Sequence, residues 1–515
     1  MTAHYNDIIV GAGSAGSVLA ARLSEDPARR VLLLEGGPDH ARPDELPEEV
    51  FHGRSMSFTG QDWGFRADVH DGRRIRYPRG KLTGGSSAVG ATVGLRGVPA
   101  DYDDWAAAGN PAWSYEGVLP YFRRLESDGD YGESEFHGGS GPIPIRRWSA
   151  DELPIGQTAF TQSCLEHGFA EVADHNHPEA TGVGSIPSTR HDRDRRATTA
   201  STYLALTRGR TNLELAPGLL VDRVVFDGQR AVGVLVGAPG AEPELVRGDR
   251  VLLAAGAIGT PAILLRSGVG PAEDLRRLGV DVRADLPGVG ANLVDHQRTG
   301  AFLVPEPGSV DRTEAFLQQI LRTTSPVTGD FNDLQYYMVN HFGLGPFPEL
   351  QMLAGTTEIL GVMVVAQRPG SRGRVAVDST DPRAAPVIRL NFLDDERELD
   401  VLVDGVRTAW RLAHHPDVLK LGQGFVVLRD AMIDNDDMVR QYVKTSLESA
   451  YHPTGTVRMG PASDPSTAVD ERGAVHGLEA LHVCDASIMP NTVRANTNLT
   501  SIMIGERMAD WLRAG

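Results

Sequence analysis

Three glycines near the start of the chain have the spacing of a turn that binds a dinucleotide. Gly11, Gly13 and Gly16 directly follow an apolar run, residues 7–10, which predicts a buried strand. Gly11 permits the tight turn, Gly13 lets a pyrophosphate approach the backbone, and Gly16 lets the next helix pack closely on the strand. The free N–H groups and positive dipole end of that helix would face the phosphates. Dinucleotides carry hydride chemistry, so these residues predict a redox cofactor.

The segments around the glycines predict the βαβ unit that would hold them in place. Residues 17–23 predict the helix, and a second apolar run, residues 31–34, predicts a strand that ends in Glu35. Glu35 is placed to accept hydrogen bonds from a ribose, and its charge would repel a 2′-phosphate. The motif alone leaves FAD and NAD as alternatives.

Farther along, the pattern predicts a second domain inserted into this cofactor fold. Aromatic and Met content rises around residues 331–347, and Asp394 would cap a long amphipathic helix. The tail returns to cofactor-domain character, with a helix from about Thr500. We therefore expect an α/β protein (α+β overall), in which a Rossmann-like domain carries a substrate domain built on an antiparallel sheet with helices. The expected bounds are 1–150, 190–300 and 445–515 for the cofactor domain, and 151–189 and 301–444 for the substrate domain.

Strand-like runs in the middle of the chain predict a small meander that feeds the last strand of the cofactor sheet. They cover residues 213–216, 221–226, 231–236 and 250–255. A glycine-dense stretch, residues 79–90, leads into small residues that predict a helix from about Ser86. The charged run 190–196 predicts a solvated loop whose charges pair with one another.

Charge and cysteine content exclude several classes of protein. The net charge of −18 would repel nucleic acid and anionic membrane surfaces. Cys164 and Cys484 are the only cysteines, which excludes a disulfide scaffold, and no Cys/His set has zinc spacing, so no metal is expected. No apolar run reaches the ~18 residues of a spanning helix, and the first strand begins too early to leave room for a signal peptide. We expect a cytoplasmic protein without nucleic-acid or membrane partners; its oligomeric state stays open.

A series of segments in a fixed order resembles the glucose–methanol–choline (GMC) oxidoreductases over essentially the whole chain. In the general character of its sequence, including residues 495–498, the chain is most similar to bacterial members that oxidise choline or furfuryl alcohol. The matching segments are 80–87, 256–270, 288–296, 371–373 with 381–382, 452–460, 485–490 and 496–500.

The resemblance implies an enzyme that oxidises a small-molecule primary alcohol to an aldehyde by hydride transfer to FAD. His452 would be the general base, and Asn496 would hold the substrate oxygen. Some members attach FAD through a histidine at the position of Val89, and valine cannot form that bond, so FAD would be non-covalent. The cofactor contacts implied by the resemblance and the first motif are Gly11, Gly13, Ser14, Ala15, Gly16, Glu35, Gly80, Gly84, Gly85, Ser86, Val89, Val221, Ala255, Gly256, Asp485, Ala486, Asn496, Thr497 and Asn498.

The chain departs from the family pattern at three positions and leaves some roles open. Thr83, Gly90 and Thr497 replace a hydrophobic residue, an Asn or His, and a Pro. Two other activities of this fold remain alternatives: a hydroxynitrile lyase with redox-silent FAD, and a dehydrogenase of a peptide-derived redox carrier. The electron acceptor is either oxygen or another molecule.

For several polar and aromatic residues near the expected site, the sequence leaves two possible roles open. Arg494 either guides an anionic or polar substrate or is solvated, and Glu448 and Tyr451 either line the site or pack elsewhere. An aromatic group either lines a pocket or packs in the core; its members are Phe331, Tyr336, Tyr337, Phe342 and Phe347.

Overall fold

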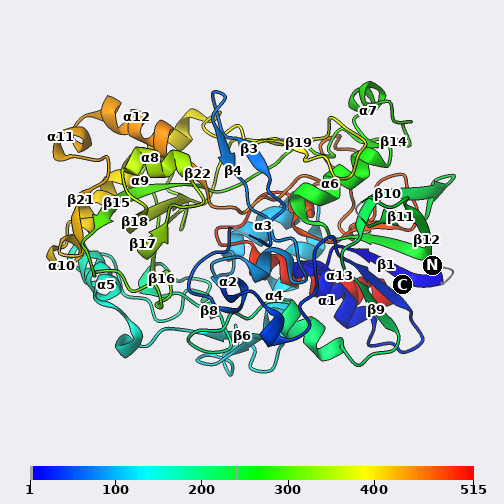
Figure 1. The fold of residues 1–515 in the computed structure, drawn as a ribbon, viewed down its shortest axis with the longest axis horizontal. Helices are drawn as coiled ribbons and strands as arrows, with labels where there is room; N and C mark the ends of the chain where they lie inside the picture. Colours follow the sequence, from blue (N-terminus) through cyan, green and yellow to red (C-terminus); the bar gives the residue numbers. More distant parts are fainter. Residues whose placement is uncertain (1–3, 59, 239, 515) are drawn as a thin grey trace.

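The protein is built around two large sheets that lie at opposite ends of the molecule (Figure 1). The structure is a computed structural model that describes residues 4–58, 60–238 and 240–514. Both termini lie at the end that holds the first sheet, where the blue and red segments of the chain meet. This arrangement confirms the expected fold class; the expected domain bounds stay a prediction.

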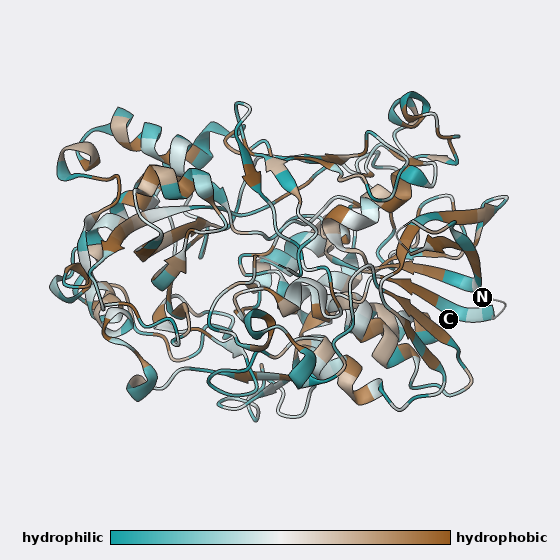
Figure 2. Ribbon diagram, viewed as in Figure 1, coloured by the Kyte–Doolittle hydropathy of each residue, from teal (hydrophilic) through white to brown (hydrophobic). Residues whose placement is uncertain are grey.

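The first sheet has a parallel centre made of apolar strands. Its order is β10-β11-β12-β1-β2-β9, with β23 paired to β12. Strands β1 and β2 are buried, as expected for a parallel sheet covered on both faces, and Figure 2 shows this centre as a hydrophobic band. The bounds are β1 His4–Val10, β2 Val31–Leu34, β9 Leu213–Ala216, β10 Leu220–Asp227, β11 Arg230–Gly237, β12 Glu244–Leu253 and β23 Leu481–Val483.

Helices α1 (Ser14–Leu23) and α13 (Asn498–Ala514) pack against each other beside this sheet (Figure 1). Glycines permit the close approaches. A Cβ on Gly505 would lie 2.9 Å from Ala15 O, and a Cβ on Gly16 would lie 1.9 Å from Gly11 O. The two ends of the chain are thereby held together around the first glycine turn.

The second sheet is antiparallel, in the order β21-β15-β18-β17-β16-β7, with β22 paired to β15. The long helix α9 (Glu396–Ala413) packs on β18 and β15, because its apolar face is buried. The bounds are β7 Gly182–Ser185, β15 Gln297–Pro305, β16 Leu317–Thr323, β17 Leu334–Gly343, β18 Glu358–Ala366, β21 Gly422–Phe425 and β22 Glu448–Ser449. The nearby helices are α5 Ile155–Glu166, α8 Pro348–Ala354, α10 Pro416–Leu419, α11 Asp430–Ile433 and α12 Asp436–Ser446.

Smaller elements connect and flank the two sheets. The bounds of the strands are β3 Arg66–Asp68, β4 Arg74–Arg76, β5 Glu126–Asp128, β6 Ile143–Arg146, β8 Ser188–Thr189, β13 Val269–Gly270, β14 Ala284–Asp285, β19 Arg374–Ala376 and β20 Val387–Arg389. The bounds of the helices are α2 Glu48–Phe51, α3 Pro99–Ala107, α4 Tyr115–Leu125, α6 Gly256–Arg266 and α7 Ala272–Leu278. No helix in the described part of the chain combines the length and apolar character needed to cross a bilayer.

Several local predictions were wrong in detail. Strand β9 pairs in parallel with β2 and is not part of the meander, which consists of β10, β11 and β12. The expected helix from about Ser86 is a single 3₁₀ turn, Gly85–Ala88, because Gly84 and Gly85 both adopt positive φ there. Asp395, and not Asp394, caps α9 by accepting a hydrogen bond from the backbone of Arg397.

Candidate active site

A cavity of about 530 Å³ runs from the parallel sheet to the antiparallel sheet. The structure brings His452 and nearly all the expected cofactor residues to its wall; the exceptions are Gly16 and Gly84. Gly16 lies behind the wall, where it lets α1 approach the first turn. Gly84 is also behind the wall and donates a backbone hydrogen bond to Ala12 O at 2.7 Å. The individual cofactor contacts stay predictions.

Three helices direct their N-terminal ends at this cavity. Helix α1 begins after Gly13, α6 begins after Ala255, and α13 begins at Asn498; each of these residues lines the cavity. None of the three helices has an acidic residue in its first turn. At α6 the first N–H is already bound by the carboxylate of Asp485, so the N-terminal ends of α1 and α13 are the ones that suit an anionic ligand such as a pyrophosphate.

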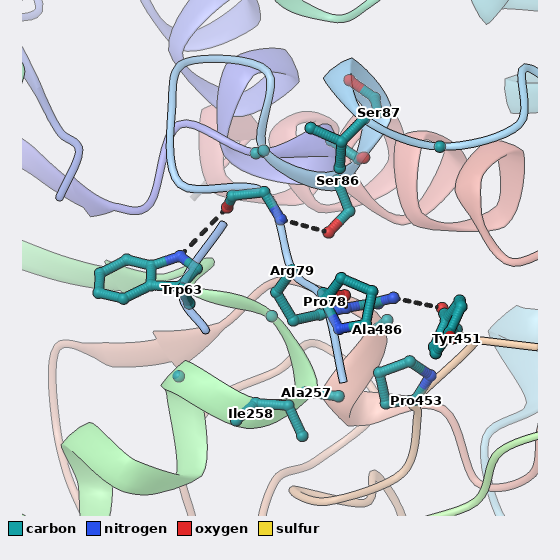
Figure 3. A pocket seen from close by; sticks show the side chains of 18 of the residues that line it. Trp63, Pro78, Arg79, Ser86, Ser87, Ala257, Ile258, Tyr451, Pro453 and Ala486 are labelled. Atoms are coloured by element: carbon teal, nitrogen blue, oxygen red, sulfur yellow. Dashed lines mark hydrogen bonds between the residues drawn. The ribbon is translucent and has the colours of Figure 1, made fainter. Parts of the chain in front are cut away.

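Two glycine turns leave bare backbone where such a ligand would lie. Gly13 and Gly85 face each other, and a Cβ on Gly85 would lie 2.7 Å from Gly13 Cα. Figure 3 shows the second turn, in which Gly80 accepts a hydrogen bond from Trp63 Nε1 at 3.1 Å and donates one to Ser86 Oγ at 3.3 Å. A larger side chain at Gly13 or Gly85 would fill the passage between the two turns.

The charges along the cavity also suit an anionic cofactor. The described residues that line it include five cations, Arg79, Lys81, Arg266, Arg298 and Arg383, and two acids. One acid, Glu35, accepts backbone hydrogen bonds from Ala12 and Gly37 at 3.0 and 2.9 Å. Burial raises its pKa to about 7. The other acid, Asp485, accepts a hydrogen bond from Gly256 N at 2.8 Å at the start of α6. The cavity thus fits a dinucleotide: backbone donors and cations for phosphates, and Glu35 at the nucleotide end for a ribose.

His452 and Asn496 meet at the other end of the cavity. His452 Nε2 lies 3.2 Å from Asn496 Nδ2, although 44 residues separate them in the chain. Asn496 Oδ1 accepts a hydrogen bond from Tyr337 of β17 at 3.1 Å. The amide group therefore directs its donor toward His452, and the Nε2 atom of His452 accepts.

A second histidine, which sequence reasoning missed as a functional residue, contacts the first. His296 Nδ1 and His452 Nδ1 are 2.9 Å apart and share one proton. Because Nε2 of His452 accepts from Asn496, its ring proton lies on Nδ1 and is donated to His296. The only sequence signal for His296 was its place in the segment 288–296 that resembles the family.

Both rings are held uncharged. The pKa of His452 lies well below its usual value because the ring is buried and because His296, Arg79 and Arg298 repel a positive charge. Burial lowers the pKa of His296 to about 3. Asp295 is close by, but its carboxylate binds the backbone N–H of His452 at 2.8 Å and not the ring. The uncharged imidazole carries its lone pair at Nε2, where it accepts from the Asn496 amide, and a substrate hydroxyl that displaced this contact would meet a proton acceptor.

The structure also shows the positions of the residues for which the sequence left two roles open. Tyr451 lines the cavity, whereas Glu448 does not and binds Arg73 at 3.2 Å. Both readings of Arg494 were wrong: it is only 4% exposed and pairs with Asp101 at 3.1 Å. Of the five aromatic residues, Tyr337 alone lines the cavity.

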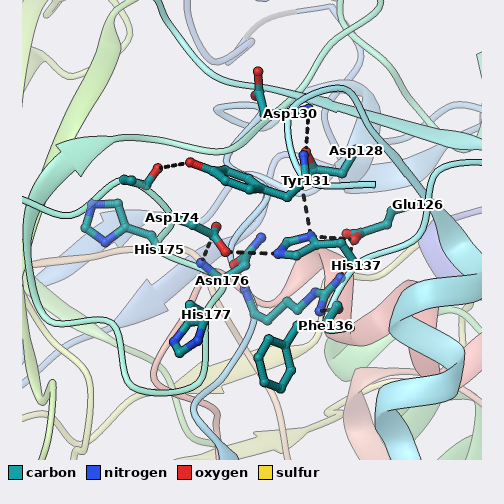
Figure 4. Close-up of polar contacts among 12 residues, drawn as sticks. Glu126, Asp128, Asp130, Tyr131, Phe136, His137, Asp174, His175, Asn176 and His177 are labelled. Carbon is teal, nitrogen blue, oxygen red and sulfur yellow. Dashed lines mark hydrogen bonds and ion pairs between the residues drawn. The ribbon is translucent and has the colours of Figure 1, made fainter. Parts of the chain in front are cut away.

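A different histidine cluster lies away from this cavity (Figure 4). His137 contacts Glu126 Oε1 at 2.8 Å, Asp128 Oδ2 at 3.1 Å and Asp174 Oδ2 at 3.0 Å. Arg96 and Arg147 bind the same carboxylates. Glu126, Asp128 and His137 are close enough to hold a metal ion. However, both ring nitrogens of His137 face carboxylates, and these raise its pKa to about 10 despite burial. With Arg96 and Arg147, the protonated ring and its carboxylates form an ion network.

Comparisons with known proteins agree with this site. A model for the GMC oxidoreductases matches residues 5–298 with its N-terminal part and residues 369–505 with its C-terminal part. This chain belongs to the GMC oxidoreductase family. It is an FAD-dependent oxidoreductase that acts on an alcohol-type donor.

Among curated proteins, the GMC oxidoreductase is similar to oxygen-dependent choline dehydrogenases. It is 35% identical to that of Yersinia pseudotuberculosis over 99% of this chain and 94% of the relative, and 35% identical to that of Escherichia coli over 99% and 95%. Among solved structures, it is similar to pyridoxine 4-oxidase from Mesorbium loti, with 27% identity and a TM-score of 0.89 over 99% of this chain and 100% of the other. A fungal aryl-alcohol oxidase shares the fold, with 24% identity and a TM-score of 0.82 over 99% of both chains.

The wall of the cavity also bears on how FAD is held. Val89 lines the cavity and is only 8% exposed. Its side chain has no nitrogen or other nucleophile that could bond to the cofactor. FAD is therefore bound without a covalent link, as expected from the sequence.

Proposed function

We propose that this GMC oxidoreductase oxidises a primary alcohol to an aldehyde, with His452 as the general base. The observation that carries the proposal is the contact between His452 Nε2 and Asn496 Nδ2, 3.2 Å apart on the cavity wall. A hydroxyl oxygen within hydrogen-bond distance of both atoms would replace their direct contact, accept a hydrogen bond from the amide and donate its proton to the imidazole. Such a base contributes about 10²–10⁴-fold to the rate.

The residues around this pair fix its orientation. His296 accepts the Nδ1 proton of His452 and so keeps the lone pair of that ring on Nε2, while the hydroxyl of Tyr337 lies 3.1 Å from the amide oxygen of Asn496. Asn496 stabilises the negative charge that develops on the substrate oxygen as the proton leaves. Bound FAD supplies the acceptor for the hydride that leaves the carbinol carbon.

The cavity residues expected from the sequence would hold that FAD. We assign the pyrophosphate to the turns at Gly11–Ala15 and Gly80–Ser86, and the ribose to Glu35. Support comes from the N-terminal ends of α1 and α13 at the cavity, which have no acidic residue in their first turns. The segment 496–498 opens α13, and its positive dipole end suits a negative charge on the reduced cofactor.

The test is anaerobic reduction of the flavin by a panel of primary alcohols, followed by air. We expect the purified holoenzyme to lose its yellow colour with a substrate alcohol and to yield one aldehyde per flavin. Return of the colour in air indicates an oxidase, and a lasting loss of colour indicates a dehydrogenase with another acceptor. Release of cyanide from a hydroxynitrile without bleaching would instead identify a lyase and end the proposal.

A further inference from the structure

Arg298 stands on the cavity wall at the end that holds His452. It lies near the start of β15, and the neighbouring residues Tyr337, Met363 and Tyr451 line the same cavity. Tyr451 directly precedes His452, and Tyr337 binds Asn496. The guanidinium group thus belongs to the wall that surrounds the proposed proton acceptor.

The hydrogen-bond donors of Arg298 have weak or neutral partners. Its Nη2 donates to the hydroxyl of Tyr451 at 3.3 Å, and its Nη1 to the sulfur of Met363 at 3.7 Å. The guanidinium carbon lies 4.9 Å from the ring centre of Tyr451 and 5.9 Å from that of Phe342. Within residues 4–58, 60–238 and 240–514, no carboxylate lies within 4.0 Å of it. An arginine carries five donors and a permanent charge, and a thioether and a phenol satisfy few of them.

The acid that could neutralise Arg298 is already engaged elsewhere. Glu448 is its cross-strand neighbour where β22 pairs with β15. Arg73 binds Glu448 at 3.2 Å, and Glu448 does not line the cavity. Glu448 offsets part of the charge of Arg298 at a distance, since both Arg73 and Arg298 act to lower the pKa of its carboxyl. However, no hydrogen bond joins Glu448 to Arg298, and the guanidinium donors on the cavity wall are left for a substrate.

A second cation adds to this field. Arg79 lines the cavity and donates a hydrogen bond from Nη2 to the carbonyl of Tyr451 at 2.6 Å (Figure 3). Both acids of the cavity wall, Glu35 and Asp485, are bound by backbone N–H groups on the cofactor side. A substrate with a quaternary ammonium group, such as choline, would meet repulsion here, whereas a substrate with a carboxylate would be attracted.

We propose that Arg298 binds a carboxylate of the alcohol substrate, so that this enzyme selects hydroxy acids over neutral and cationic alcohols. The planar fork of the guanidinium group matches a carboxylate with two parallel hydrogen bonds. Met363 and Tyr451 would exchange their weak contacts with Arg298 for this charged pair. The inference rests on the proposed alcohol oxidation at His452 and names the substrate class of that same site.

The first experiment compares matched alcohols that differ only in charge. The probes are 4-(hydroxymethyl)benzoate, its amide and its trimethylammonium analogue, and 4-hydroxybutanoate, its amide and choline. Anaerobic stopped-flow measurement gives the flavin reduction rate and apparent Kd for each. We expect at least one carboxylate to be about 10- to 100-fold more efficient than its amide, since a hydrogen bond to a charged group is worth ~1.5–3 kcal/mol. The ammonium compounds should be the poorest.

The second experiment removes the charge. Arg298→Gln should abolish the preference for the carboxylate, measured as the ratio of the efficiencies with carboxylate and amide in the same variant, whereas Arg298→Lys should keep part of that ratio. Arg312→Gln is the matched control, because Arg312 belongs to the same side of the molecule, is exposed and pairs with Glu358. The control should keep the full preference. A preference for amide or ammonium in the wild type, or an unchanged preference in Arg298→Gln, overturns the inference.

Binding without turnover separates this inference from the proposed function. Calorimetric titration of the holoenzyme with 4-methylbenzoate and 4-methylbenzamide does not require oxidation. Carboxylate binding that is about tenfold tighter than amide binding, and that disappears in Arg298→Gln, supports the role of Arg298 even if no alcohol bleaches the flavin. In that case the proposed alcohol oxidation alone fails. Equal binding of both compounds to wild type and variant rejects the role of Arg298 while the oxidation can still stand.

Discussion

Two histidines of this chain differ in charge, one a cation and the other neutral, for reasons that their neighbours make plain. His137 is 1% exposed and lies between three carboxylates, which raise its pKa to about 10. His452 contacts another imidazole and an amide, and its pKa lies well below the usual value. Burial acts in the same direction on both rings, so the partners decide the outcome.

The comparison separates a structural histidine from a reactive one. At His137 both ring nitrogens face carboxylates (Figure 4). Arg96 and Arg147 bind the same carboxylates and complete the network. At His452 no carboxylate contacts the ring within the described part of the chain, and Nε2 faces a cavity. A ring without an acid partner stays neutral and can take up a proton; a ring among acids has already done so.

The largest expected effect concerns the reactive member of the pair. His452→Ala should lower the flavin reduction rate by about 10²–10⁴-fold, because the acceptor for the hydroxyl proton is lost. Stopped-flow reduction with the best alcohol of the panel measures it, and flavin absorbance checks that FAD is retained. His4→Gln, at an exposed histidine paired with Asp249, is the control and should reduce at the wild-type rate. Wild-type reduction in His452→Ala would exclude this histidine from proton transfer.

Replacing the structural histidine should affect stability and not the chemistry. His137→Gln leaves the carboxylates of Glu126, Asp128 and Asp174 without their shared cation, which costs about 3–5 kcal/mol in the free energy of unfolding. Urea denaturation monitored by tryptophan fluorescence measures the loss. His4→Gln again serves as control, with a change below ~1 kcal/mol for an exposed pair. If His137→Gln unfolds like wild type, the network does not stabilise the fold.

A smaller effect is expected at His296, a positioning residue. His296→Leu removes the acceptor for the Nδ1 proton of His452 and should slow flavin reduction about tenfold, the value of one hydrogen bond. The apparent Kd of the alcohol should stay the same, because His296 does not line the cavity. His296→Gln keeps an acceptor and should recover most of the rate. Equal losses in both variants, or a loss confined to Kd, would contradict the positioning role.

Sequence reasoning succeeded where local patterns or ordered segments determine the structure. The fold class was confirmed, and the first glycine turn lies between β1 and α1 with Glu35 at the end of β2, as predicted. The meeting of His452 and Asn496 was predicted from the resemblance, because segments 452–460 and 496–500 match the two family segments that carry the catalytic pair. The roles of these residues are still predictions.

Sequence reasoning failed where a charge finds its partner far along the chain. The run 190–196 is exposed and self-paired in its middle, where Arg195 binds Asp192 as expected. Its two ends were wrong, because Arg190 and Arg196 are buried and donate hydrogen bonds to backbone carbonyls of residues 50–55 and 90. Arg494 binds Asp101, which lies 393 positions earlier. The same limit applies to Arg298, since no local pattern reveals that its strand places it on a cavity wall with no carboxylate of the described residues within 4.0 Å.

The smallest expected effect is a difference in sign between the two histidines as pH changes. His137 has a folded pKa of about 10 against ~6.5 when unfolded, so the folded state binds its proton more tightly. Its contribution to stability is complete below pH ~6.5 and is lost as pH rises toward 10. For His452 the folded pKa is the lower one, so the unfolded state gains a proton first and stability is lost as pH falls below ~6.5. Urea denaturation from pH 5 to pH 10 measures the free energy of unfolding of each variant. The difference between wild type and His137→Gln should shrink above pH ~6.5. Below pH ~6.5, the free energy of unfolding of His452→Ala should rise relative to that of wild type. A deficit of His137→Gln that is constant over this range would mean that the ring is not protonated in the folded protein, and the contrast between the two histidines would fail.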